Sequence, residues 1–387
     1  MSRGREAVAG RLVLDDRVAA GTIVIEDGLI AAVDLADAGP STTGADRDAR
    51  TAAIIAPGFV DIHVHGGGGH DAMGGAGALD GMARHLLQHG VTSFLPTAVS
   101  APVPALGAFA ERVREWMPRA AADGAAPLGF NLEGPFLAPS RRGAHDALAL
   151  RTPADTPRPE LEGLVDGLRV ITVAPELPGA LELIAWFRER GVVTSLGHSA
   201  ATLAEARAGI AAGATSATHL FNAMSGIDHR LPGLAVASLV DDGTSIELIA
   251  DGEHVHPALW PIVIRTKPDG RVLLVSDAIP RAGLGDGRGT IGGLEIEVIG
   301  SRATLLGTAT LAGSVIALDA AVRNLVEAGF DLPLAVAAAS RNPLMLLGVT
   351  DRGRIEVGQR ADLVDLDDAL RVRRVMRAGV WHATAGH

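Results

Sequence analysis

The feature that most constrains the fold is a repeated alternation of short apolar runs with Ala-rich helical segments. The apolar runs include 59–65, 92–97, 128–136, 168–175, 192–198, 214–224, 245–251 and 271–278, and helix candidates such as 179–191 and 201–213 separate them. Repeated strand–helix units predict a parallel sheet that is buried on both faces, and about eight units predict a closed (β/α)8 TIM-type barrel of the α/β class. A doubly wound open sheet is the alternative.

Polar side chains with catalytic potential stand at the ends of these apolar runs. They are His63 and His65 after FVDI, Glu133 after LGFNL, His198 after VVTSLG, His219 after ATSAT and Asp277 after RVLLVS. In a barrel all strands open at one face through their carboxyl ends, so residues far apart in sequence meet there. This placement favours the barrel over the open sheet.

Both ends of the chain have a different pattern. Short β-branched runs with Asp-Gly or Gly turns occupy 10–33, 354–366 and 372–380. Such runs are typical of short strands in a small sheet. We therefore predict a small β-sandwich domain from residues 1–56 and 353–387, and a catalytic barrel from residues 57–352.

The composition excludes several classes of partner and chemistry. The net charge is −11, which argues against binding to nucleic acid or to an anionic membrane. The chain has no Cys, so disulfides, thiolate nucleophiles and zinc–thiolate sites are excluded. The sequence shows neither a signal peptide nor a membrane span, and we expect a cytoplasmic protein.

The strand-end residues predict a metal-dependent hydrolase. His63 and His65 are two positions apart, which places both imidazoles on one face of a strand, a workable arrangement for ligands of one metal. Each histidine alone has a structural explanation. Packing does not readily explain why four histidines and two carboxylates all stand at strand ends. Asp277 is the candidate general base. The only lysine, Lys267, lies in a turn-like KPDG, which argues against a Walker A motif and against a carboxylated lysine between two metals.

Several segments resemble the N-acetylglucosamine-6-phosphate deacetylases of the amidohydrolase superfamily. The resemblance extends nearly from end to end, and it rests on PGFVDIHVHGGGG, TSFLPT, NLEGPF, RRGAH, GHS, THLFNAM, HRLPG, IADGEHVHP, SDA and LAGS. The HxH pair and the strand-end histidines are common to the superfamily. THLFNAM, the pair NLEGPF and GAH, and the LAGS segment are more specific to the deacetylases.

The resemblance implies a metal centre. Glu133, His198 and His219 would hold the principal ion, and Asp277 would act as catalytic acid and base. In some members the residues equivalent to His63 and His65 are Gln and Asn, and one ion serves. Because both are His here, a second site that includes Asp277 is expected, hence two divalent ions per subunit. Zn²⁺ is the expected metal, with Fe²⁺, Mn²⁺ or Co²⁺ as alternatives.

The resemblance also implies a phosphorylated amino sugar as substrate. The residues expected to bind it are His145, which would polarise the acetamide carbonyl or hold the sugar, together with Asn222, the Ala223 backbone N–H, Arg230, His254 and Leu311. A homodimer with the active site near the subunit interface is expected. The implied reaction converts N-acetylglucosamine 6-phosphate to glucosamine 6-phosphate and acetate. The alternatives are a cyclic-amide hydrolase, a deacetylase for another amino-sugar phosphate such as the galactosamine epimer, and a non-catalytic sugar-phosphate binder.

Overall fold

The centre of the molecule is a barrel of parallel strands. The computed structural model describes residues 4–36 and 53–384. Eight strands pair in sequence order: β5 (Phe59–Val64), β8 (Val91–Ala98), β10 (Phe130–Phe136), β11 (Leu168–Val173), β12 (Val193–Leu196), β13 (Ser216–Ala217), β14 (Ser245–Leu248) and β15 (Val272–Leu274), with β9 (Ala126–Pro127) paired to β8. The Asp277 N–H donates to the His63 carbonyl at 2.9 Å, so the segment after β15 meets β5. The barrel is confirmed and the open sheet is not.

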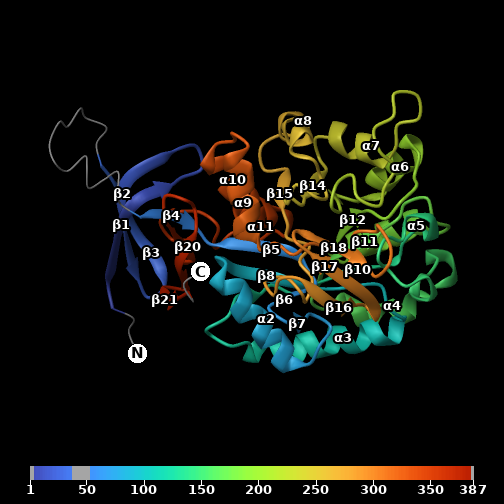
Figure 1. Cartoon of the computed structure of the whole chain (residues 1–387), viewed down its shortest axis with the longest axis horizontal. Helices are drawn as coiled ribbons and strands as arrows, with labels where there is room; N and C mark the ends of the chain where they lie inside the picture. The colour runs from blue at the N-terminus through green and yellow to red at the C-terminus, as the bar shows by residue number, and fades with distance from the viewer. Residues whose placement is uncertain (1–3, 37–52, 385–387) are drawn as a thin grey trace.

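Helices surround the barrel and bury one face against it (Figure 1). They are α2 (Ala76–Gln88), α3 (Val103–Trp116), α4 (Arg158–Val165), α5 (Ala180–Glu189), α6 (Leu203–Ala212), α7 (Leu234–Val240), α8 (Trp260–Thr266), α9 (Leu318–Glu327), α10 (Leu332–Ala339) and α11 (Arg341–Leu346), with 3₁₀ turns η1 (Met117–Arg119), η2 (Pro139–Arg141), η3 (Ala147–Ala149), η4 (Pro153–Asp155) and η5 (Pro257–Leu259). In α3, Leu106, Phe109 and Val113 are fully buried, and the Phe109 ring lies edge-on to Phe130 of β10 at 5.6 Å. None of the helices within 4–36 and 53–384 has the length and apolar character that crossing a bilayer requires.

Strands from both ends of the chain form a second, seven-stranded sheet. It comprises β1 (Glu6–Val13), β2 (Val18–Glu26), β3 (Leu29–Leu35), β4 (Ile54–Pro57), β19 (Leu363–Leu366), β20 (Val372–Arg377) and β21 (Val380–Ala383). Its own core includes Leu12, Ile23 and Ile55 from the first segment and Leu363 from the last. The sheet stands at one side of the barrel (Figure 1). The predicted union of the two ends is confirmed, whereas the domain bounds 1–56 and 353–387 stay a prediction.

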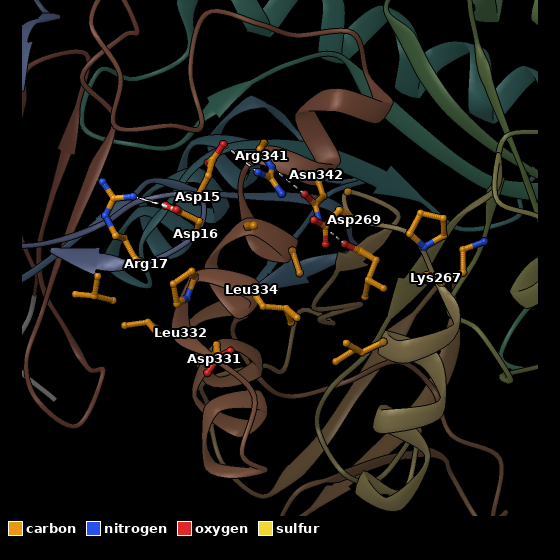
Figure 2. A pocket seen from close by; sticks show the side chains of 18 residues that line it. Asp15, Asp16, Arg17, Lys267, Asp269, Asp331, Leu332, Leu334, Arg341 and Asn342 are labelled. Atoms are coloured by element: carbon orange, nitrogen blue, oxygen red, sulfur yellow. Dashed lines mark hydrogen bonds and ion pairs between the residues drawn. The ribbon is translucent and has the colours of Figure 1, made fainter.

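The turn between β1 and β2 packs on the amino-terminal face of the barrel, beside a cavity of about 570 Å³ (Figure 2). Asp15 in this turn pairs with Arg341 of α11 at 3.0 Å. Lys267 also lines this cavity, and its Nζ donates to the carbonyl oxygens of Ser238 (2.9 Å) and Asp241. The KPDG turn therefore lies at the end of the barrel opposite the carboxyl ends of the strands.

Residues after β15 form a small antiparallel sheet that the sequence analysis did not predict. Its strands are β16 (Gly287–Ile291), β17 (Leu294–Ile299) and β18 (Arg302–Leu305); a shorter pair, β6 (Gly66–Gly67) and β7 (His70–Asp71), follows β5. The Gly292-Gly293 pair between two alternating runs is an available hairpin signal. Ile291 and Ile296 pack with Val99 and Ile279, which fixes this sheet over the carboxyl-terminal mouth of the barrel.

Candidate metal centre

The six strand-end residues converge at the carboxyl-terminal mouth of the barrel. His63 and Glu133 lie within β5 and β10, while His65, His198, His219 and Asp277 follow directly on β5, β12, β13 and β15. All six are buried. The convergence follows from the barrel, because eight parallel strands direct their final residues into one volume.

These residues form two overlapping groups that can hold metal ions, and both contain Glu133. One group is His63, His65 and Glu133; the other is Glu133, His198 and His219. Glu133 Oε1 lies 3.0 Å from His198 Nε2 and 2.8 Å from His219 Nε2, and its Oε2 lies 3.2 Å from His65 Nε2. A cation held by either group would therefore have Glu133 among its ligands.

Asp277 adjoins the first of these groups. Its Oδ1 is 3.1 Å from His65 Nε2 and 3.6 Å from His63 Nε2. Both Asp277 and Glu133 line the cavity at the mouth, but only Glu133 belongs to both groups. Asp277 is therefore near enough to the first group to contact a cation held there. It also faces the cavity in which a substrate would bind.

The imidazole orientations show which nitrogen atoms point inward. Nδ1 of His65 faces the Thr97 carbonyl at 3.1 Å, and Nδ1 of His198 faces the Arg141 carbonyl at 2.8 Å. A carbonyl oxygen only accepts, so each Nδ1 must donate and each neutral ring turns the lone pair of Nε2 toward the centre. This orientation by outer hydrogen bonds is typical of metal-ligating histidines.

Imidazole nitrogen atoms crowd together in the centre. Nε2 of His198 lies 3.1 Å from Nε2 of His219, and within the described ranges the buried Nε2 of His63 has no hydrogen-bond partner. Lone pairs that face one another repel unless a proton or a cation lies between them. Imidazole and carboxylate ligands in this arrangement fit a divalent cation such as Zn²⁺.

Charges inside the centre are strongly coupled. Burial would raise the pKa of Glu133, but the charges of His145 and His63 hold it well below its usual range. Burial would also raise the pKa of Asp277, but its hydrogen bond with His65 and the neighbouring imidazoles lower it to about 2. Burial lowers the pKa of His65, yet hydrogen bonds to Asp277 and Glu133 raise it to about 9. Without metal, protons on the imidazoles balance the negative charges of Glu133 and Asp277. Divalent cations would take the place of these protons.

His198 behaves differently from His65. Burial and the charges of His145 and His219 lower the pKa of His198 to about 4, against the opposing effect of Glu133. His198 is therefore neutral at physiological pH. A neutral imidazole is the form that coordinates a metal.

Three of the candidate ligands have an unusual backbone conformation. The φ angles of His198, His219 and Asp277 are 47°, 28° and 50°. Non-glycine residues seldom adopt positive φ, and such strain collects at functional sites where the surrounding structure enforces it. The chain turns sharply out of these three strands, and this turn directs the side chains into the mouth.

A cavity of about 330 Å³ opens beside the centre. Five of the predicted substrate-binding residues line it: His145, Asn222, Ala223, His254 and Leu311. Nδ1 of His145 accepts from the Ser100 N–H at 3.1 Å, so its Nε2 carries the hydrogen and faces Glu133 Oε2 at 3.2 Å. Nδ1 of His254 faces the buried Asp251 Oδ2 at 2.6 Å. Both imidazoles are thus held in fixed orientations at the cavity wall.

Arg230 is the one predicted substrate residue outside this set. It lies on an exposed loop in which Asp228 Oδ1 accepts the backbone N–H of Arg230 at 2.7 Å and of Leu231 at 2.8 Å. It is absent from the described residues that line the cavity.

Sequence reasoning missed two carboxylates that contact the imidazole rings of predicted site residues. Glu247 Oε2 lies 2.8 Å from His63 Nδ1, and Asp251 holds His254. A signal for Glu247 was available, because it is the one charged residue in the apolar run SIELIA.

Comparison with known proteins agrees with this geometry. Residues 54–381 match the Amidohydrolase family. The chain is 42% identical over 351 residues to human N-acetylglucosamine-6-phosphate deacetylase, covering 86% of this chain and 84% of the relative. It is 40% identical over 364 residues to N-acetylgalactosamine-6-phosphate deacetylase of Escherichia coli O157:H7, covering 92% and 93%.

Solved structures agree as well. A mutant N-acetyl-D-glucosamine-6-phosphate deacetylase from Mycobacterium smegmatis, in complex with N-acetyl-D-glucosamine-6-phosphate, superposes with a TM-score of 0.88 at 35% identity, covering 98% of this chain and 99% of that one. The N-acetylglucosamine-6-phosphate deacetylase of Thermotoga maritima gives 0.88 at 32% identity, covering 97% and 99%. The resemblance noted in the sequence is confirmed, and the chain belongs to the Amidohydrolase family.

Proposed function

We propose that this protein hydrolyses the N-acetyl group of N-acetylglucosamine 6-phosphate to give glucosamine 6-phosphate and acetate. The observation that carries the proposal is the position of Asp277, which stands between the shared Glu133 centre and a cavity lined by His145, Asn222 and His254. The deacetylases among the relatives, human and bacterial, support the same reaction.

Two divalent ions, most simply Zn²⁺, complete the site in this proposal. His63, His65 and Glu133 would hold one ion, Asp277 lying beside it, and Glu133, His198 and His219 would hold the other. When bound, such ions lower the pKa of a water ligand toward neutrality and polarise a carbonyl group. The ligand set also suits Fe²⁺, Mn²⁺ or Co²⁺.

Asp277 and His145 have separate roles. The Asp277 carboxylate is ionised at neutral pH, since its pKa is lowered, so it is able to accept a proton from the attacking water. It then delivers that proton to the departing amine nitrogen. His145 presents an N–H at Nε2, and this donor is suited to the acetamide carbonyl oxygen or to a sugar hydroxyl.

The phosphate end of the substrate would contact Asn222, the Ala223 N–H, His254 and Arg230, with Leu311 against the sugar. A phosphomonoester dianion requires several donors, and bidentate guanidinium contacts are among the strongest. We expect Arg230→Ala to raise KM for the 6-phosphate by roughly 10-fold or more, with kcat much less affected, because a charge-assisted hydrogen bond contributes about 1.5–3 kcal/mol. Steady-state kinetics with phosphorylated and unphosphorylated N-acetylglucosamine measure this.

The control for this prediction is Arg288→Ala, an exposed arginine in β16 that pairs with Glu297 at 3.4 Å. Its kinetic constants should match those of the unchanged protein. Equal KM values for Arg230→Ala and for the unchanged protein would contradict the phosphate role of Arg230.

The exposed position of Arg230 supports a homodimer in which this loop reaches the partner subunit's active site. Ile227 and Leu231 on the same loop are 56% and 83% exposed, so the loop carries apolar surface that the partner subunit would cover in this dimer. If the loop crosses over, mixing Arg230→Ala and Asp277→Asn subunits restores part of the activity, because one hybrid site has both residues.

The cytoplasmic location stays a prediction.

The galactosamine epimer is the second candidate substrate. It has a specific basis, since the Escherichia coli relative that acts on N-acetylgalactosamine 6-phosphate matches 92% of the chain. One experiment tests both: metal analysis of the purified protein, followed by acetate release from N-acetylglucosamine, its 6-phosphate and N-acetylgalactosamine 6-phosphate. We expect a higher kcat/KM for N-acetylglucosamine 6-phosphate than for N-acetylglucosamine or for N-acetylgalactosamine 6-phosphate. Equal rates with and without phosphate would contradict the substrate class.

A further inference from the structure

Glu247 is a buried carboxylate that belongs to neither metal-ligand group. It lies in β14 between Ile246 and Leu248, and its side chain is 1% exposed. A charged group in such a position needs a compensating partner, because burial without one is very costly. The contacts of Glu247 therefore indicate what the residue does.

One oxygen of Glu247 contacts both metal-ligand groups. Oε2 accepts the backbone N–H of His219 at 3.1 Å and lies 2.8 Å from Nδ1 of His63. The backbone carbonyl of Glu247 also accepts the N–H of Leu220 at 2.8 Å. The carboxylate is thus anchored to the end of β13 while it holds the ring of a histidine on β5.

This anchoring fixes the tautomer of His63. A carboxylate accepts a hydrogen from Nδ1, so the lone pair of Nε2 is directed at the centre, where it lies 3.6 Å from both Glu133 Oε1 and Asp277 Oδ1. Glu247 Oε1 has no hydrogen-bond partner within the described part of the chain, so the side chain makes its contacts through Oε2.

We propose that Glu247 is a positioning residue that orients His63 as a ligand and so completes the His63, His65 and Glu133 metal site. Outer carboxylates that accept from a ligating imidazole fix its orientation and increase its basicity toward the metal. This inference rests on the two-ion centre proposed above. Glu247 holds an imidazole only in the first group, since in the group of Glu133, His198 and His219 it contacts a backbone N–H and no ligating side chain.

The test compares Glu247→Leu with Glu247→Gln in the full-length protein. Zn²⁺ affinity is measured by competition with a chromophoric chelator, and Zn²⁺ content by elemental analysis. Glu247→Leu removes the acceptor for His63 Nδ1. We expect it to lower the affinity for one of the two Zn²⁺ ions by roughly 10–100-fold. Glu247→Gln keeps an acceptor oxygen and should retain most of that affinity. Thr172→Val is the matched control, because its hydroxyl bonds to Thr218 in the barrel and contacts no ligand.

The variant His63→Asn shows whether Glu247 acts through His63. If it does, the double variant Glu247→Leu/His63→Asn binds Zn²⁺ no more weakly than His63→Asn alone. If the losses of Zn²⁺ affinity in the two single variants add up in the double variant, Glu247 does not act through His63. An equal loss of affinity for both ions in Glu247→Leu would also overturn the proposed role of Glu247. An unchanged protein that binds one ion, unaffected by His63→Asn, would instead refute the two-ion proposal itself, so the two failures are distinguishable.

Discussion

Replacement of Asp277 by Asn is expected to lower kcat roughly 10²–10⁴-fold, the range that a positioned proton-transfer group contributes. Asn has nearly the same shape but neither accepts nor releases the proton that hydrolysis must move from water to the leaving nitrogen. Asp277 lies outside both metal-ligand groups of three, so the variant should keep its metal ions and change KM little. The measurements are acetate release at saturating substrate and elemental analysis of the same preparation.

A suitable control for Asp277→Asn is Asp319→Asn. Asp319 is also a buried aspartate, but it pairs with His89 at 3.2 Å and with Arg323 at 2.6 Å on the outer helices. This control should lower stability while kcat stays normal. Near-normal turnover in Asp277→Asn would refute the role of proton carrier, and a loss of metal would instead identify Asp277 as an essential ligand.

The barrel and the convergence of the candidate ligands were predictable because each depends on a local pattern. Apolar runs of strand length, each followed by a helix, leave few alternatives to parallel strands. Once strands are parallel, the residues that end them must meet, so His198 and Asp277 could be brought together from sequence although they are far apart in the chain. The same reasoning needs no knowledge of side-chain contacts.

Residues that act through other residues were harder to predict. Glu247 stands inside an apolar strand, and only the neighbouring strands reveal that it contacts His63 and the backbone of His219. The tautomers of His65 and His198 likewise depend on the carbonyl oxygens of Thr97 and Arg141, which are distant in sequence. Sequence patterns report burial and periodicity, whereas these contacts depend on strand register.

The position of Arg230 shows a different limit. The sequence motif predicts a phosphate contact, yet within one chain the residue lies on an exposed loop and not among the described lining residues of the cavity. A site that two subunits share cannot be completed from one chain. The hybrid-subunit experiment therefore addresses what neither the sequence nor a single fold determines.

Glu133→Gln is expected to have the broadest effect, because Glu133 is common to both metal-ligand groups. Its two oxygens face different histidines, with Oε1 toward His198 and His219 and Oε2 toward His65. Gln keeps the shape but removes the charge that would balance the proposed cations. Breaking a buried charge pair costs about 3–5 kcal/mol, which corresponds to roughly 150- to 4,000-fold weaker binding.

The prediction separates Glu133 from the other ligands. Elemental analysis after gel filtration should find both ions depleted in Glu133→Gln, whereas His65→Asn should lose one ion and keep the other, since His65 belongs to one group. Circular dichroism would verify that both variants fold. Equal metal loss in the two variants would contradict the separate groups, and full retention of metal by Glu133→Gln would show that the histidines hold both ions without the shared carboxylate.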